Sequence, residues 1–543
     1  MNATIDRPNV GAVLDDKHVG HIRGAFGTIL HHDHGPRQNW RHRLQTLLAI
    51  IGPGLIVMVG DNDAGAFGAY TQAGQNYGTT LLWTLLLLIP VLYVNQEMVL
   101  RLGAVTGVGH ARLILERFGK FWGAFSVIDL FLLNALTIVT EFIGIALALN
   151  YLGVSKALGV SLSAILIMAA ASTGDFRRFE RFSMALVAGS LLLIPVFLAI
   201  HPPMAQLARD FVTPQVPEGK LSDVMLLIIA IVGTTVAPWQ LFFQQSYVID
   251  KRITPRFMAY ERADLWLGIV LVIIGAVAMM AFTAAAFAGK PEFGNFTDAG
   301  AVATGLEQHA GRAVGVMFAI ALIDACIIGA SAVSLSTAYA LGDVLSLKHS
   351  LHRKPSDAKG FYVVYFGLIV LAAGLVLTPG APLGLLTNAV QTLAGVLLPS
   401  ATVFLLLLCN DKDVLGPWVN GRWLNVFTSA VIGALVILSI ILTASVMLPD
   451  AADETFILAI LGGGGLLTLL GALATFVLRS KGETMKKIDP QLRATWRMPP
   501  LYKLPPARLS KASRLWMIVL RLYLVIAGGL VLWRIVALAL TAQ

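Results

Sequence analysis

Two carboxylates, Asp61 and Asp63, stand inside an otherwise apolar stretch, residues 44–70. Glycines flank them at Gly60 and Gly65. A carboxylate at the centre of a bilayer costs about 2.5–3.5 kcal/mol on insertion scales, so it is rarely left there without a partner. No cationic side chain stands near these two acids in the sequence. The simplest neutralising partner is a bound cation, held where the glycines allow the helix to unwind.

The spacing of the two acids limits how they can act together. In a continuous helix, residues two apart point about 200° away from each other. Asp61 and Asp63 address one cavity only if the chain is unwound between them. Asn62 would then add an amide oxygen. For all three residues a helix-capping or water-facing role is the alternative, and Asp63 is the residue on which we base the site.

A second apolar stretch, residues 222–249, is interrupted at Pro238. Proline removes one backbone hydrogen bond and clashes with the carbonyl four residues earlier, here that of Thr234. Interruptions at corresponding positions of two halves are the best sequence pointer to a transport site. Unwound backbone carbonyls and half-helix C-termini at the middle of the membrane are negative ends suited to a cation. Gln240 adds a hard amide oxygen, or it packs toward another helix.

Composition places these breaks in a membrane protein. Of the 543 residues, 57% are hydrophobic and 13% are charged. Long apolar windows recur, and each can cross a hydrocarbon core of about 30 Å, which predicts about thirteen helical spans. The expected order is a polar tail, two repeats of five spans, two further spans, a basic linker and a last span (1–43, 44–200, 222–409, 424–478, 479–515 and 516–540).

The net charge of +9 follows the positive-inside pattern rather than a nucleic-acid surface. Basic residues gather in the loops after even-numbered spans, which predicts a cytoplasmic N-terminus and, for an odd number of spans, an outside C-terminus. The histidines of the first 43 residues lack paired metal-site spacing, so we expect a disordered tail. The linker 479–515 is expected to be a solvated tether, with lipid headgroup contact as the alternative.

Other buried acids have open roles. Glu141 and Asp324 lie within apolar spans, where each either lines an ion or proton pathway or forms an internal pair. Glu97 stands one turn before Arg101, which favours a structural pair. The chain carries no nucleophile elbow, P-loop or HExxH motif, and its two cysteines have no CxxC spacing. An enzyme and a resident cofactor are therefore not expected.

Scattered motifs resemble the Nramp divalent-metal transporters. The likeness covers about residues 45–450 and rests on these runs: Gly52-Pro53-Gly54, Asp63-Ala64-Gly65-Ala66, Gln72-Ala73-Gly74, Leu81-Leu82-Trp83, Arg101 to Gly107, Glu141-Phe142-Ile143-Gly144, Thr235-Val236-Ala237-Pro238 and Asn410-Asp411. The resemblance implies an all-α polytopic membrane protein with a LeuT-like inverted repeat of five plus five helices, broken in helices 1 and 6, and two or three extra C-terminal helices. It also implies that Asp63 and the carbonyls near Gly60 and Thr234 hold the metal.

The chain departs from the family at the centre of that site. Ala64 and Ala66 replace the proline and asparagine of the first-helix motif, and Ala237 and Trp239 replace the methionine and histidine of the sixth. Further along, Ile138 replaces the third-helix acid and Leu397 the tenth-helix glutamine.

These replacements affect which metal ion the site would prefer. Without a methionine sulfur at Ala237, only hard oxygen donors remain, and Mg²⁺ suits a site with few protein ligands because it keeps several waters. The chain is similar here to the Nramp-related magnesium transporters. With few titratable groups left, we expect weak or no proton coupling.

The sequence thus predicts a secondary transporter of divalent cations, most simply Mg²⁺, that works by alternating access in a bacterial inner membrane. One alternative is proton-coupled Mn²⁺ or Fe²⁺ transport as in the main family. Another is an amino-acid or organic-solute transporter of the same architecture, which Asp61 and Asp63 disfavour. The expected partners are the metal ion and the bilayer.

Overall fold

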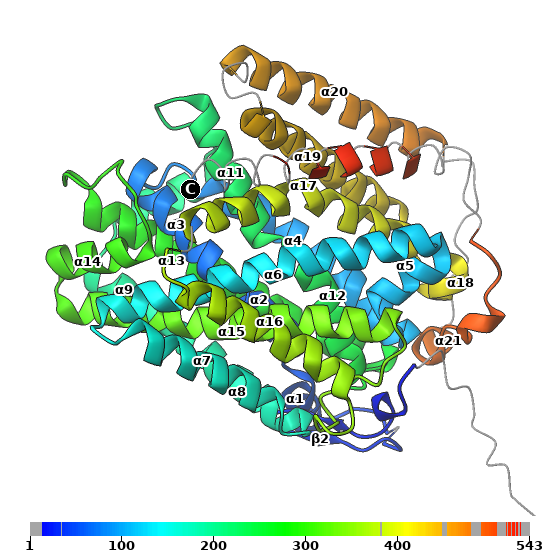
Figure 1. Ribbon diagram of the computed structural model, residues 1–543. Helices are drawn as coiled ribbons and strands as arrows, with labels where there is room; N and C mark the ends of the chain where they lie inside the picture. The colour runs from blue at the N-terminus through cyan, green and yellow to red at the C-terminus, as the bar shows by residue number, and fades with distance from the viewer. Residues whose placement is uncertain are drawn as a thin grey trace, which may run out of the picture.

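The protein is a bundle of helices with one small hairpin at its N-terminal end (Figure 1). The computed structural model describes residues 14–33, 35–380, 383–447, 453–478 and 490–507, with scattered positions between 517 and 533. Most of the predicted last span, 516–540, lies outside the described residues. The hairpin pairs β1 (Ile22–Arg23) antiparallel with β2 (Thr28–Ile29).

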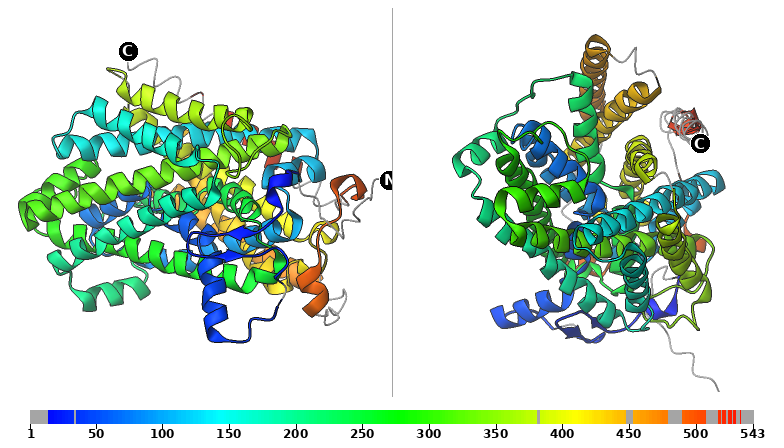
Figure 2. Two further views of the ribbon diagram at one scale, coloured as in Figure 1. Left: turned by 90° about the horizontal axis from the view of Figure 1, so that it is seen from below. Right: turned by 60° about the vertical axis from the view of Figure 1, so that its left-hand side comes forward.

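Two sets of helices follow each other in the order expected for a repeat. The first set is α2 (Pro53–Val59) with α3 (Ala64–Tyr77), α4 (Trp83–Thr106), α6 (Lys120–Tyr151), α7 (Lys156–Ala171), and α8 (Phe176–Gly189) with α9 (Leu193–Ile200). The second is α11 (Leu221–Thr235) with α12 (Pro238–Asp250), α13 (Met258–Phe287), α15 (Arg312–Val344), α16 (Lys359–Leu377) and α17 (Leu383–Cys409). Two further helices, α19 (Arg422–Met447) and α20 (Glu454–Leu478), pack together on one side of the bundle (Figures 1 and 2).

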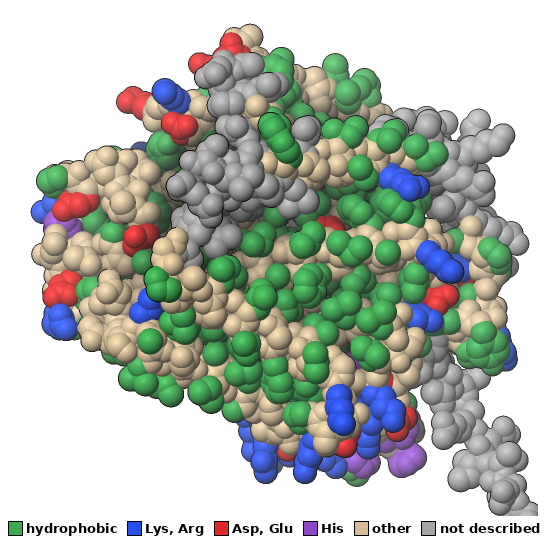
Figure 3. Space-filling view, viewed as in Figure 1, with side chains coloured by type: hydrophobic (Ala, Val, Ile, Leu, Met, Phe, Trp, Pro, Cys, Tyr) green, Lys and Arg blue, Asp and Glu red, His purple; other side chains and the backbone are tan. Residues whose placement is uncertain are grey.

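Shorter elements connect these spans. They are the helices α1 (Trp40–Ile50), α5 (His110–Phe118), α10 (Met204–Val212), α14 (Ala299–Ala310), α18 (Lys412–Leu415) and α21 (Pro490–Thr495), and the 3-10 turns η1 (Asp16–His18), η2 (Ser190–Leu192), η3 (Pro255–Phe257), η4 (Gly416–Trp418) and η6 (Leu501–Lys503). Within the described part of the chain, nine helices are long and apolar enough to cross a membrane, or ten if α1 and α2, bent by 50°, form one span. Hydrophobic side chains cover the middle of the face in Figure 3, and Lys and Arg gather along its lower edge.

Both predicted helix breaks are present, and their causes are local. Asp63 adopts an extended conformation and caps α3, its carboxylate accepting a hydrogen bond from the Ala66 amide at 3.0 Å. Ala237 is the extended N-cap of α12, and Pro238 occupies the first turn, where its missing N–H costs nothing. The prediction of an all-helical chain broken in its first and sixth spans is confirmed.

Close packing by α13 fixes the first broken helix on both sides of its break. A Cβ atom at Gly54 would lie 2.7 Å from the Leu265 backbone, and one at Gly74 would lie 2.3 Å from the Met280 carbonyl oxygen. Glycines therefore let α2 and α3 approach α13 more closely than any side chain would allow. The unwound residues between α2 and α3 are held in place by this contact.

The N-terminal segment, residues 14–33, is ordered, so the expectation of a disordered tail is wrong for it. Arg353 pairs with Asp15 at 2.8 Å. Arg177 and Arg252 donate hydrogen bonds to backbone carbonyls of the segment. These charge-assisted contacts offset the entropy that is lost when the segment is ordered. The arginines come from loops of the predicted cytoplasmic side, and the segment lies across the ends of those spans.

The basic linker is also docked where it is described. Within residues 490–507, the Met498 amide donates to the Val105 carbonyl at 3.2 Å, and the Arg493 guanidinium stacks on Trp418 at 4.1 Å. The expectation of a solvated tether is therefore wrong for this part of the linker, because apolar and stacking contacts are available on the bundle. The rest of 479–515 lies outside the described residues.

We expect a pH dependence in the contact between the N-terminal segment and the loop after α15. The His349 imidazole lies 3.0 Å from the Asp343 carboxylate, and its ring packs 5.4 Å from that of His18. Burial alone would lower the pKa of His349, but the charge of Asp343 and its hydrogen bond raise it from 6.5 to about 9. The stabilisation that the His349–Asp343 pair gives the folded state is complete below pH 6.5, and it is lost as the pH rises through about 9.

The melting temperature of the detergent-solubilised protein should therefore fall between pH 6.5 and about 9. In His349→Ala this fall should be reduced, and the variant should melt lower than wild type at pH 6.5. If the melting temperature fell equally with pH in wild type and in His349→Ala, the effect could not be assigned to His349.

Candidate cation site

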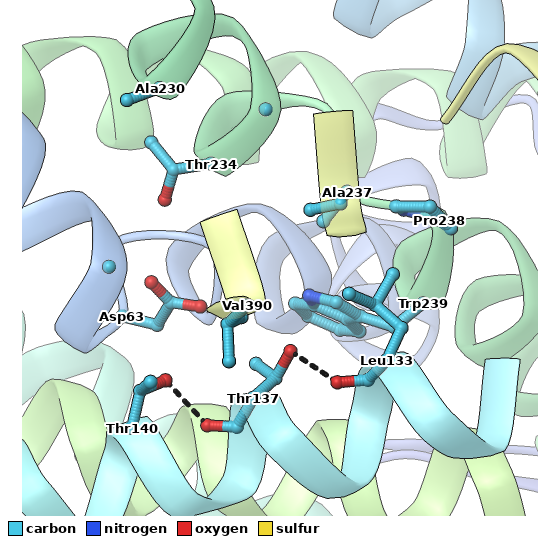
Figure 4. A pocket seen from close by; sticks show the side chains of 13 residues that line it. Asp63, Leu133, Thr137, Thr140, Ala230, Thr234, Ala237, Pro238, Trp239 and Val390 are labelled. Atoms are coloured by element: carbon cyan, nitrogen blue, oxygen red, sulfur yellow. Dashed lines mark hydrogen bonds between the residues drawn. The ribbon is translucent and has the colours of Figure 1, made fainter. Parts of the chain in front are cut away.

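A cavity of about 50 Å³ lies where the two helix breaks meet (Figure 4). Its walls come from α3, α6, α11, α12 and α17, and its lining residues are Asp63, Gly65, Leu133, Thr137, Thr140, Ala230, Gly233, Thr234, Ala237, Pro238, Trp239, Val390 and Ala394. The lining is apolar apart from one carboxylate and three threonines close to it. Such a small set of polar groups in an apolar pocket is typical of a ligand site.

The polar lining presents oxygen atoms. Asp63 and Thr234 point into the cavity from opposite breaks (Figure 4). The Thr137 hydroxyl donates to the Leu133 carbonyl at 2.9 Å, and the Thr140 hydroxyl donates to the Thr137 carbonyl at 2.7 Å. Because both threonine protons are used by the helix backbone, their oxygen lone pairs remain available to the cavity. The site is therefore a set of acceptors, which suits a cation.

A second carboxylate, Glu141 of α6, lies directly behind the first. It accepts a hydrogen bond from the Ala64 amide at 3.1 Å, and its Oε1 atom is buried without a hydrogen-bond partner. A Cβ atom at Gly329 would lie 3.0 Å from the Glu141 carboxyl carbon and 3.1 Å from the Asp63 Cβ. Within the described residues, no ion pair includes Asp63 or Glu141. Two neighbouring buried acids thus lack a protein cation.

Asp61 does not line this cavity, although it is fully buried. Its Oδ1 atom accepts a hydrogen bond from the Gln240 side chain, which in turn accepts one from Gln96 at 2.8 Å. The expectation that Asp61 and Asp63 address one cavity is therefore not met. Asp61 and Gln240 instead bind each other, because Gln240 faces back toward the first break rather than into the cavity.

Asn62 is also turned away. Its amide nitrogen donates to the Val272 carbonyl of α13 at 3.3 Å, and a Cβ atom at Gly275 would lie 2.4 Å from that nitrogen. Gly60 ends α2 and packs beside Trp239, whose ring would be 3.7 Å from an added Cβ. Of the seven predicted metal-site residues, the structure brings three to the cavity: Asp63, Thr234 and Ala237.

Asp324 lies outside the cavity. It faces the end of α8, where a Cβ atom at Gly189 would lie 2.3 Å from its Oδ1 atom, and it lines neither this cavity nor the smaller one beside it. The expected pair of Glu97 and Arg101 is present, at 3.2 Å. Leu397 is buried and does not line the cavity either.

One acid was missed in the sequence. Asp129 of α6 lines the smaller cavity, next to the first. The signal was present, because Asp129, Leu133, Thr137 and Glu141 stand four residues apart and therefore share one side of the helix. A second acid in an apolar span at that spacing would have indicated a continuous polar track along α6.

Comparison with known proteins agrees with this architecture. The family model "Natural resistance-associated macrophage protein-like" matches residues 54–445, more than half of the chain. The chain is 31% identical over 401 residues to the "Divalent metal cation transporter MntH" of Ralstonia nicotianae, covering 71% of this chain and 87% of that protein. It is 27% identical over 418 residues to the protein of the same name from Pectobacterium carotovorum, covering 74% and 95%.

Among solved structures, the chain is similar to the Eremococcus coleocola manganese transporter, bound there to an aromatic bis-isothiourea compound. The TM-score is 0.64 at 19% sequence identity, with 86% of this chain and 98% of that chain covered. The likeness confirms the predicted fold, an all-helical polytopic membrane protein. The fold, the two helix breaks and the family match lead to one conclusion: the chain belongs to the Nramp family.

Proposed function

We propose that the protein carries divalent metal cations across a membrane by alternating access. The observation that supports this most directly is the pair of buried carboxylates, Asp63 and Glu141, at the meeting point of two helix breaks and without a protein cation. The similar MntH proteins are named as divalent metal cation transporters. A bacterial cytoplasmic membrane with the N-terminus inside fits the arrangement of the basic loops.

For the ion, the comparisons support the Mn²⁺ alternative over Mg²⁺. A similar solved structure is named a manganese transporter, and an all-oxygen site accepts Mn²⁺ as well as Mg²⁺. One observation favours Mg²⁺ as a second candidate: Ala237 lines the cavity where a sulfur ligand would select softer ions. We therefore propose a hard-ion site that takes Mn²⁺ and discriminates weakly against Mg²⁺.

Ile138 and Trp239 stand where the family has titratable side chains, which argues against proton coupling. The arrangement of the remaining acids supports proton involvement more strongly. Two adjacent carboxylates in an apolar setting repel each other when both are charged. A metal ion at Asp63 together with a proton on Glu141 removes that repulsion, so the metal ion and the proton enter the site together. We propose that Glu141 takes up the proton, because it stands behind the metal-facing Asp63.

Asp63→Ala should reduce Mn²⁺ uptake by proteoliposomes to below a tenth of wild type, since loss of the one carboxylate in the cavity costs at least about 1.4 kcal/mol of ion binding. Asp324→Asn is the matched control, because this carboxylate faces α8 and should leave uptake unchanged. Normal uptake by Asp63→Ala would place the site elsewhere.

Ala237→Met should shift selectivity toward Mn²⁺, because a thioether next to the ion favours transition metals over Mg²⁺. The measurement is competition of Mg²⁺ against Mn²⁺ uptake. Ala237→Leu adds similar bulk without sulfur and serves as the control. Identical selectivity in the two variants would refute the role given to the missing sulfur.

Glu141→Gln should separate metal movement from proton movement. In wild type, a lumenal pH dye should report acidification during Mn²⁺ uptake. In the variant, acidification should be lost while some Mn²⁺ uptake remains, because the amide cannot carry the proton. Metal uptake by wild type without acidification would instead favour the uncoupled transport expected from the sequence.

A further inference from the structure

A second, smaller cavity of about 10 Å³ adjoins the first and shares Leu133 and Pro238 with it. Its other lining residues are Ile114, Ser126, Asp129, Leu130, Phe242, Ser400, Ala401 and Phe404, from α5, α6, α12 and α17. The volume is about that of one water molecule. Since Leu133 and Pro238 alone are common to both linings, they form the partition between the two cavities.

The two cavities lie along one track. On α6, Asp129 stands eight residues before Thr137 of the first cavity, which is about 12 Å along a helix. On α17, Val390 and Ala394 line the first cavity, and Ser400 and Ala401 line the second. Since α6 begins after a loop of the predicted cytoplasmic side, the second cavity lies between the first cavity and that side.

The chemistry of the second cavity matches that of the first. The Oδ1 atom of Asp129 is buried without a hydrogen-bond partner. The Ser126 hydroxyl donates to the Gly123 carbonyl at 3.0 Å, and the Ser400 hydroxyl donates to the Leu397 carbonyl at 2.8 Å. Both serine oxygens therefore keep lone pairs for the cavity, as the threonines do above.

A purely structural role does not account for Asp129. Within the described residues it enters no ion pair, and Ser400, whose hydroxyl donates to the Leu397 carbonyl, lines the same cavity. Asp129 is half-buried, but its buried Oδ1 atom has neither a cation nor a donor, and an aliphatic side chain would fill the same place without that cost. A carboxylate on the wall of a water-sized cavity has a use if cations pass it.

Building on the proposed function, we propose that Asp129, with Ser126 and Ser400, forms a second binding site for the transported divalent cation on the cytoplasmic side of the central cavity. The ion binds there through one carboxylate and two hydroxyl oxygens, the hard donors that divalent ions such as Mg²⁺ and Mn²⁺ accept. The site lowers the barrier between the central cavity and the cytoplasm, and Leu133 and Pro238 separate the two stations.

The test compares Mn²⁺ transport from the two faces in inside-out and right-side-out vesicles. In Asp129→Asn, the KM for metal offered at the cytoplasmic face should rise about tenfold, the change that corresponds to 1.4 kcal/mol of lost binding. For metal offered at the opposite face, the KM should stay unchanged and the maximal rate should fall, since release becomes slower. Asp129→Glu should restore most of the KM at the cytoplasmic face and most of the maximal rate from the opposite face. Asp324→Asn should match wild type in both measurements.

Unchanged kinetics from both faces in Asp129→Asn would overturn the inference. A lower maximal rate from both faces without a change in either KM would also overturn it, because that is the result of a damaged fold. In both cases wild type transports metal and Asp63→Ala does not, so the proposed function stands. If wild type moves no divalent cation, the proposed function fails, and this inference fails with it.

Discussion

The structure depends on negative charge that is buried without a protein cation. Two other buried acids are matched: Glu180 lies 2.6 Å from Lys251, and Asp264 accepts hydrogen bonds from the amides of Gly52 and Gly54. Asp63 accepts a hydrogen bond from the Ala66 amide, and within the described residues it enters no ion pair. Desolvation of an unpaired charge is expensive, and a cation bound at Asp63 would offset that cost.

Because Asp63 has to stay in position to meet a cation, the helix break that carries it must be rigid. An unwound segment in a membrane exposes backbone groups that have to be satisfied within the protein. Asp63 caps α3, and Asn62 binds the Val272 carbonyl of α13, so the residues on both sides of the break are fixed. Glycine contacts bring α13 close enough for this to happen. The acid keeps its place because its neighbours are held by other helices.

The sequence predicted most of the fold, because apolar length, Pro238 and the acids at the first break are local signals. It predicted the direction of side chains poorly. Asp61 and Asn62 directly precede Asp63, yet they face α12 and α13, because no helical periodicity applies within an unwound segment. The N-terminal segment was misjudged for a related reason: its order depends on Arg353 and other distant arginines, which short-range patterns do not reveal.

The displacement of Asp61 from the cavity has a mechanical consequence. Its bond to Gln240 joins the end of α2 to α12, the half-helices that lie on the predicted cytoplasmic side of the two breaks, and Gln96 extends the connection to α4. Separating these elements would leave buried polar groups unpaired, at about 1–3 kcal/mol for each. The two half-helices are therefore expected to move as one unit during alternating access. Asp63, on the other side of the break, is free to respond to the ion alone.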